Sequence, residues 1–201
     1  MRVILNVDGK GKSYLLQDGT LSYYRKIGKA LQDIKNGDHP DYLFFGFFTL
    51  CAATLEYSLN YLLTNHCLNQ FGPEKYKKYA EGYIGLSFPK KLMMSPSILS
   101  NGSLVFKTNH STYLALAEMI TLRNKILHNK EFLKEVQIPL DQFWEKDEFE
   151  FSVELETNYI DKLNKDSCLK LAKALEDFRN YVMLPFIQQT LEGNELLEKT
   201  G

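Results

Sequence analysis

The stretch "DYLFFGFFTLCAATLEYSLNYLLTNHCLNQF", from Asp41 to Phe71, decides the fold of this 201-residue chain. It is strongly apolar, and between Tyr42 and Phe71 only Glu56 carries a formal negative charge. A segment of this length and character predicts a central helix that is buried on most of its circumference. The polar residues that interrupt it argue against a span through a membrane.

Helical periodicity continues on both sides of this stretch. Residues 21–36 carry apolar side chains at spacings of three and four, which predicts an amphipathic helix; its stripe consists of Leu21, Tyr24, Ile27, Leu31 and Ile34. Further along, Ser111 and Thr112 are typical of a helix N-cap and are followed by a third helical pattern. A last amphipathic helix is expected after Asn158, until Pro185 bends or breaks it.

Shorter patterns predict a small β element. The segments "RVILNV" and "SYLLQDG" flank a glycine-rich turn, which predicts a β-hairpin within residues 1–19. Alternating apolar and polar residues predict a strand at 149–156, whose natural partner is that hairpin. Residues 72–110 hold proline, glycine and serine at short intervals, so we expect an irregular insertion with a short helix or two. We expect residues 192–201 to be frayed and 1–201 to form one mainly α domain.

Composition excludes several classes of protein. Twenty-four basic and twenty-five acidic residues give a net charge of -1, so no global positive field attracts nucleic acid and any contact with RNA must be local. The cysteines, Cys51, Cys67 and Cys168, are scattered without the pairing of a zinc site. We expect a cytoplasmic protein without a metal or other cofactor and without a signal peptide or membrane anchor.

The third helical pattern contains the stretch "TLRNKILHNK", Thr121 to Lys130, which places Arg123, Asn124 and His128 close together. Burying these groups without partners would be costly, so they should line a cleft or a contact between subunits. Arg123 and His128 are five residues apart, hence about 140° around the helix, too far to grip one small ligand from a single helix. Two copies of the chain that face each other across a twofold axis would bring them into one groove.

These residue types suit work on a phosphodiester. A guanidinium clamps phosphate oxygens in a bidentate manner, and an imidazole moves protons near neutral pH. RNA supplies its own nucleophile, the ribose 2'-hydroxyl. The motif therefore suits chemistry on a phosphodiester of RNA.

The segment from Arg123 to His128 resembles the motif of the HEPN superfamily, which consists of an arginine, four to six intervening residues with a polar one first, and a histidine. Asn124 stands at the polar position. The resemblance implies a four-helix bundle, with the β segments as accessories, and a homodimer that joins two motifs. In many members it also implies a metal-independent ribonuclease of toxin-antitoxin, phage-defence or RNA-processing systems. Other members only bind, and a protein antitoxin or a nucleotidyltransferase is a further possible partner.

The resemblance also assigns roles to residues. His128 would act as general acid or base, Arg123 would stabilise charge on the phosphorane, and Asn124 would position the phosphate or the histidine, giving a 2',3'-cyclic phosphate. Glu56, on the helix that precedes the motif helix, would support the polar network of the motif.

Four further residues are candidates for contacts with RNA: Tyr113, Lys125, Lys90 and Lys91. Tyr113 could stack on a base, although its place on the apolar stripe also suits a core residue. Positive charge interleaved with apolar residues could guide an RNA backbone, although a solvated surface gives the same pattern.

Two alternatives stay open at this point. His128 could simply stabilise the C-terminal end of its helix, where a cation is favoured. The whole chain could then be a non-catalytic helical dimer that serves as a protein-interaction module.

Overall fold

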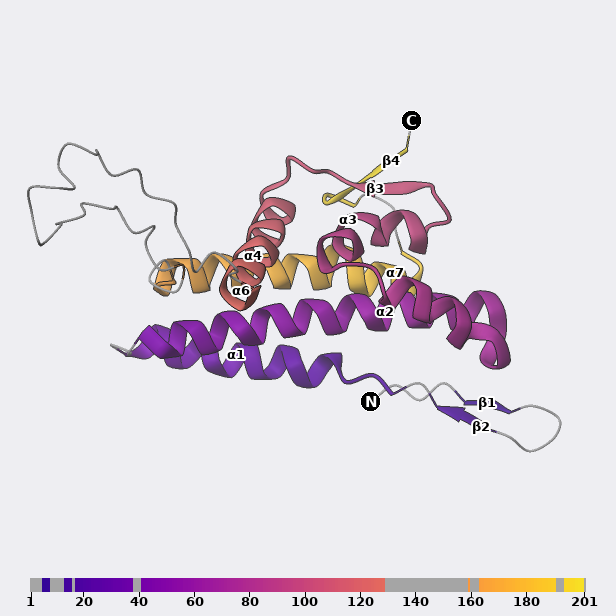
Figure 1. The fold of residues 1–201 in the computed structure, drawn as a ribbon, viewed down its shortest axis with the longest axis horizontal. Helices are drawn as coiled ribbons and strands as arrows, with labels where there is room; N and C mark the ends of the chain where they lie inside the picture. Colours follow the sequence, from indigo (N-terminus) through magenta and orange to yellow (C-terminus); the bar gives the residue numbers. More distant parts are fainter. Residues whose placement is uncertain are drawn as a thin grey trace, which may run out of the picture.

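The computed structural model describes residues 5–7, 13–15, 17–37, 41–128, 159, 163–190 and 194–200. These residues are mostly helical, which confirms the prediction of a mainly α chain with a small β component (Figure 1). The helices are α1 (Thr20–Asn36), α2 (Asp41–Ile84), α3 (Phe88–Leu99), α4 (Ser111–His128), α6 (Lys165–Phe178), the π-helix η2 (Arg179–Met183) and α7 (Leu184–Gln188). The strands are β1 (Leu5–Val7), β2 (Ser13–Leu15), β3 (Leu104–Phe106) and β4 (Leu197–Lys199).

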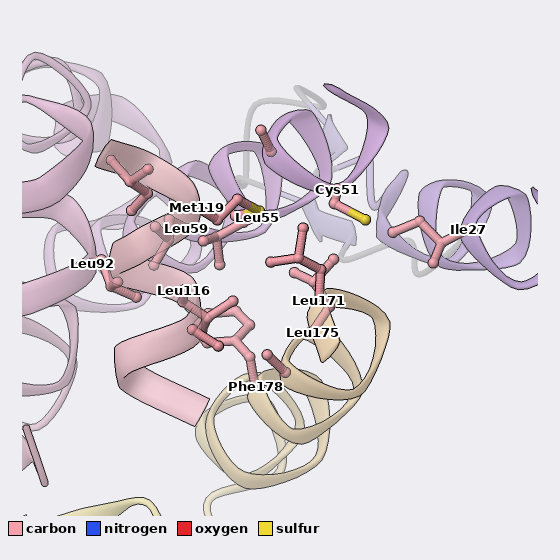
Figure 2. Close-up of a cluster of buried hydrophobic side chains, with 14 of the residues drawn as sticks. Ile27, Cys51, Leu55, Leu59, Leu92, Leu116, Met119, Leu171, Leu175 and Phe178 are labelled. Atoms are coloured by element: carbon pink, nitrogen blue, oxygen red, sulfur yellow. The ribbon is translucent and has the colours of Figure 1, made fainter. Parts of the chain in front are cut away.

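Four helices enclose the core. Figure 1 shows α1, α2 and α6 running alongside one another while α4 crosses them, and each of these helices contacts at least two of the others. The core side chains between them are aliphatic, aromatic, thiol or thioether groups, as Figure 2 shows. Its labelled members are Ile27 from α1, Cys51, Leu55 and Leu59 from α2, Leu92 from α3, Leu116 and Met119 from α4, and Leu171, Leu175 and Phe178 from α6. Burial of these groups supplies the main driving force for folding.

The first helix forms where the apolar spacing predicts it, although its buried stripe is narrower. Ile27 and Ile34 are buried, while Leu21 at the N-terminal end of α1 is exposed. The carboxylate of Asp18 accepts hydrogen bonds from the backbone N–H and the hydroxyl of Thr20, at 2.9 and 2.6 Å, and so satisfies a free donor at the start of the helix. The N–H of Gly19 donates to the hydroxyl of Tyr57, which ties this start to α2.

Helix α2 is longer than the apolar stretch that predicts it. The helix bends at Gly72, where φ is 73° and ψ is 170°, and then continues to Ile84. Pro73 lacks an N–H and therefore suits the first turn of the second helical segment. Residues 72–110 thus begin with a helical segment, because a helix can restart at a Gly-Pro step. Together with α3 this segment matches the expected short helix or two, although the region is less irregular than the prediction has it.

By length and composition, α2 is the one helix in the described part of the chain that would be able to cross a membrane, from Tyr42 to Ile84. Core helices of globular proteins pass the same test. In this structure 44% of its most apolar window is buried, and α2 packs against α1, α3, α4 and α6.

The remainder of the expected insertion contains α3 and the strand β3. This strand pairs antiparallel with β4, with Leu104 opposite Lys199 and Phe106 opposite Leu197. The prediction of a frayed tail at residues 192–201 is therefore wrong for the described residues 194–200. Leu196 and Leu197 are buried there, so apolar side chains hold the tail against the helices.

The predicted N-terminal hairpin is confirmed. Strands β1 and β2 pair antiparallel, with Leu5 opposite Leu15 and Val7 opposite Ser13. The expected strand at 149–156, with its pairing to the hairpin, lies outside the described residues.

The two helices that follow the insertion begin at polar caps. At the start of α4 the Nδ1 atom of His110 accepts a hydrogen bond from the N–H of Thr112, at 3.2 Å, so the described cap contact comes from His110, whereas the expected cap residues Ser111 and Thr112 lie within the helix. Helix α6 begins at a capping box between Asn164 and Ser167. The π-helix η2 comes immediately before Leu184 and Pro185, where the proline removes a helical donor.

Candidate functional site

Three helices bring opposite charges together near the C-terminal half of α4. Glu56 comes from α2, Lys91 from α3 and Arg123 from α4. The two carboxylate oxygens divide between the two cations: Oε1 of Glu56 lies 3.6 Å from Nζ of Lys91, and Oε2 lies 3.8 Å from Nη2 of Arg123. We call Glu56, Lys91 and Arg123 the Glu56 cluster. Two cations share one anion, so the cluster has a formal charge of +1.

The members of the cluster differ in their contact with solvent. The side chain of Lys91 is 5% exposed, that of Arg123 is 27% exposed and that of Glu56 is 34% exposed. Lysine is almost never buried to this degree unless it is paired. The cluster is thus layered, with the ammonium inside and the guanidinium toward the surface.

Two neighbours besides Glu56 orient the guanidinium of Arg123. Its Nη1 donates a hydrogen bond to Oδ1 of Asn124, at 3.0 Å. Its Cζ also lies 5.9 Å from the centre of the Phe88 ring, which is within the range of a cation–π contact. The guanidinium is therefore oriented from three sides, by a carboxylate, an amide and an aromatic ring.

The spacing along α3 explains why Lys91 is buried. Phe88, Lys91 and Ser95 follow one another at intervals of three and four residues and lie on the packed face of the helix. Lys90 is one position away, hence about 100° around the helix, and is exposed. The interpretation of Lys91 as an exposed guide for an RNA backbone is therefore corrected, whereas Lys90 has the exposure that this role requires.

A small cavity of about 120 Å³ adjoins the cluster between α2 and α4. Most of its lining is apolar; the lining residues include Phe45, Thr49, Ala53, Glu56, Arg123 and Leu127. Leu127 itself is 53% exposed. A charged cluster thus stands at the rim of an apolar hollow on the surface of this protein.

His128 is the last residue of α4, and its side chain lies outside the described part of the structure. Its backbone is five residues beyond Arg123 on the same helix, which corresponds to a rise of about 7.5 Å. The structure therefore brings Glu56, Arg123 and Asn124 together, and the convergence of His128 with them remains a prediction. The groove between two copies of the chain likewise remains a prediction.

Two other candidates for RNA contacts have partners elsewhere. Tyr113 is half-buried near the start of α4, where its ring lies 5.3 Å from that of Phe106, and it is ten residues from Arg123. Nζ of Lys125 lies 4.7 Å from the centre of the Tyr159 ring, and both side chains line a cavity of about 350 Å³ between α4 and α6. Neither residue joins the Glu56 cluster.

No group of three or more His, Cys, Asp or Glu side chains able to hold a metal occurs among the described residues. His66 lies on α2, and its burial lowers the pKa of its imidazole, which favours the neutral form. All three cysteines are buried as free thiols. The donor arrangements that hold a structural zinc ion are not found in the described part.

Sequence reasoning missed the roles of Phe88 and Lys91 in the site. A signal for both was present, because Phe88, Leu92 and Pro96 recur at helical spacing and place residue 91 on the same side. The proline-rich composition of that region obscured this pattern.

Comparisons with models of protein families, with curated proteins and with solved structures give no match for this chain. The geometry and the charge of the Glu56 cluster are therefore the basis for assigning a function.

Proposed function

We propose that this protein is a HEPN-like RNA-binding homodimer that cleaves RNA without a metal. The observation that carries the proposal is the arrangement around Arg123. Its guanidinium is held by Glu56 and Asn124 at the surface, on the helix that ends in His128. The planar guanidinium presents pairs of N–H donors that match the oxygens of a phosphate in a bidentate manner.

The proposed reaction uses side chains of the chain itself. Arg123 binds the scissile phosphate and stabilises the charge that develops on the phosphorane. His128 takes the proton of the ribose 2'-hydroxyl or gives a proton to the leaving 5'-oxygen. The 2'-oxygen attacks phosphorus, the bond to the 5'-oxygen breaks, and the products carry a 2',3'-cyclic phosphate and a 5'-hydroxyl.

A dimer supports this proposal in two ways. The formal charge of +1 at each Glu56 cluster would be doubled in a twofold groove, which supplies local attraction for RNA in a chain of net charge -1. The second copy would also cover the exposed Leu127 and the apolar cavity beside it.

The test uses the purified chain with a mixed pool of single-stranded RNA, in buffer with EDTA. We expect cleavage to fall about 10²- to 10⁴-fold in His128→Ala, the usual effect of losing a general acid or base, and to fall together with RNA affinity in Arg123→Ala. Arg25→Ala is the matched control, because Arg25 is an exposed arginine of α1 outside the cluster. Product ends are identified by their reaction with phosphatase and polynucleotide kinase, and dimerisation by light scattering.

Equal cleavage by the wild type and both variants would overturn the catalytic assignment. RNA binding that depends on Arg123 without any cleavage would leave an RNA-binding member of the same kind. A toxin-antitoxin or phage-defence role predicts in addition that expression of the wild type slows growth and that Arg123→Ala abolishes this effect.

A second candidate function is a non-catalytic dimer that serves as a protein-interaction module. The exposure of Met93 and Leu127, together with the apolar cavity, favours this alternative. It predicts that Leu127→Asp disrupts the dimer while Arg123→Ala has no effect on any measured activity.

A further inference from the structure

Lys91 is an unusual residue in this protein because it carries a charge inside the packed face of α3. Its side chain is 5% exposed, and among the described residues Glu56 is the carboxylate placed in an ion pair with it. A lysine buried in this way needs a stable anionic partner, since an unpaired buried charge is strongly unfavourable. The Lys91–Glu56 pair is thus the fixed part of the cluster.

Arg123 is the member of the cluster that can release Glu56 and bind another anion in its place. Its side chain is 27% exposed, against 5% for that of Lys91, so it is the cation of the cluster that a ligand can reach from solvent. A guanidinium has five N–H donors, and the described contacts use few of them. A phosphate that approaches from solvent would therefore meet Arg123 before it meets Lys91.

We propose that Lys91 is the permanent countercharge of Glu56, which allows Arg123 to leave the carboxylate and bind a phosphate of RNA. This inference rests on the proposed function and assigns a positioning role to Lys91 at the same site. If Lys91 were neutral, Arg123 would be the sole cationic partner of Glu56 in the cluster. Its departure toward a ligand would then leave a partly buried carboxylate unpaired.

Lys91 also removes a second obstacle to binding. A carboxylate beside the guanidinium repels an incoming phosphate, and Lys91 offsets that repulsion because it lies 3.6 Å from the same carboxylate. The cluster without Lys91 would be neutral rather than positive. Anion binding should consequently depend on Lys91 although its ammonium is hidden from the anion.

The first experiment measures binding of a fluorescent single-stranded RNA 12-mer. We expect Lys91→Met to weaken binding about tenfold, which corresponds to about 1.4 kcal/mol. Lys91→Arg should retain the affinity of the wild type within about threefold, because the charge is kept. In Lys91→Met/Glu56→Gln the affinity should recover, because no carboxylate then competes for Arg123. Lys26→Met is the matched control, since Lys26 is an exposed lysine of α1 outside the cluster.

Unchanged RNA affinity in folded Lys91→Met would overturn the inference, and so would a loss in Lys91→Met that the added Glu56→Gln fails to reverse. If Lys91→Met does not fold, Lys91→Gln replaces it in both measurements, and the same two results would overturn the inference. Circular dichroism and thermal melts establish which variants are folded.

The second experiment needs no RNA and separates this inference from the proposed function. Thermal melts of Arg123→Met, Glu56→Gln and their double variant give the coupling between these two residues. The same set is then measured in the Lys91→Met background, where we expect a larger coupling because Arg123 becomes the sole partner of Glu56. An equal coupling in both backgrounds overturns the role of Lys91. A wild type that binds no RNA, with the coupling larger in the Lys91→Met background, overturns the proposed function and leaves the electrostatic role of Lys91 in place.

Discussion

At the scale of single residues, the three thiols show how burial in the core changes the pKa of a side chain. Cys51 and Cys67 lie on α2 and Cys168 on α6, and all three are buried. Burial raises the pKa of Cys51 far above its ordinary range, with a further contribution from the neighbouring Cys168, and raises the pKa of Cys168 to about 11. These thiols therefore stay protonated at neutral pH, and protonated thiols are poor nucleophiles.

The raised pKa of Cys168 predicts a loss of stability in alkali. Its ordinary value is 9.0, so between pH 9 and about 11 the unfolded chain loses a proton that the folded protein keeps. The unfolded state then binds fewer protons, and the free energy of unfolding falls as the pH rises through this window. Urea denaturation at pH 8 and pH 10.5 measures the fall, which we expect to be smaller in Cys168→Ala than in the wild type. Equal falls in the two proteins would refute this assignment.

A buried hydroxyl gives a second prediction at this scale. Thr112 is buried, and its Oγ1 donates to Oδ2 of Asp177 across the α4–α6 contact at 3.1 Å. We expect Thr112→Val to lower the free energy of unfolding by about 1 kcal/mol, the usual net value of one hydrogen bond. Thr121→Val is the control, because the exposed Thr121 on the same helix bonds to the carbonyl of Ala117 within its own helix. Urea denaturation of both variants should separate them; similar losses would contradict the role of the Asp177 contact.

At the scale of elements, the bend in α2 depends on one backbone conformation. Gly72 has φ 73° and ψ 170°, a region that is nearly restricted to glycine. Among the described residues nothing lies within 4 Å of a Cβ added at Gly72, so the expected effect of a substitution comes from the backbone conformation. The two segments of α2 are therefore joined by a conformational constraint rather than by packing at this residue.

This constraint predicts opposite effects at two glycines of the same helix. Gly72→Ala should lower the free energy of unfolding by about 1–3 kcal/mol. Gly82→Ala, where a Cβ also meets no atom within 4 Å and φ is not positive, should raise it by about 0.5–1 kcal/mol because alanine is the better helix former. Chemical denaturation of the pair checks both signs. An unchanged free energy of unfolding in Gly72→Ala would show that the backbone at the bend adopts another conformation at little cost.

The elements that could be predicted from the sequence are those with local signals. The apolar spacing in residues 21–36 and the stretch from Asp41 to Phe71 predict α1 and the first part of α2, since a long periodic segment specifies its own buried face. The restart of α2 after Pro73 was missed because proline ends most helices yet suits the first turn of a new one. A local pattern cannot distinguish these two outcomes.

The candidate site, too, could be predicted only where its residues are close together in the sequence. The motif indicates Arg123 and Asn124, and the structure places these two side chains in contact with each other and Arg123 in an ion pair with Glu56. The ion pair of Lys91 could not be predicted from two adjacent lysines, because its partner is a carboxylate 35 positions away on another helix. Side-chain partners that are distant in the sequence leave no periodic signal.

At the scale of the whole molecule, residues 194–200 are held against the rest of the fold by burial and by hydrogen bonds. Leu196 is 0% exposed, and its carbonyl accepts a hydrogen bond from the N–H of Lys107, at 3.1 Å. The Oδ1 atom of Asn194 accepts from the N–H groups of Leu196 and Leu197, at 3.0 and 3.1 Å. The tail is therefore fixed beside the connection between α3 and α4.

This anchorage predicts a large effect of one tail residue. Leu196→Ala should lower the free energy of unfolding by about 2–5 kcal/mol, as expected for a fully buried leucine. Glu198→Ala, an exposed position two residues further along, should change it by less than about 0.5 kcal/mol. Thermal melts followed by circular dichroism compare the two. A small effect at Leu196 would mean that the tail contributes little to stability.

The pairing of β3 with β4 has a consequence for synthesis on the ribosome. The hydroxyl of Thr200 donates to the carbonyl of Gly102, and these residues are 98 positions apart. At a translation rate of about 5–20 residues per second, β3 emerges roughly 5–20 s before the strand that completes its ladder. During this interval the open edge of β3 can pair with a neighbouring nascent chain on the same messenger. Short strands limit that hazard, and both β3 and β4 have only three residues.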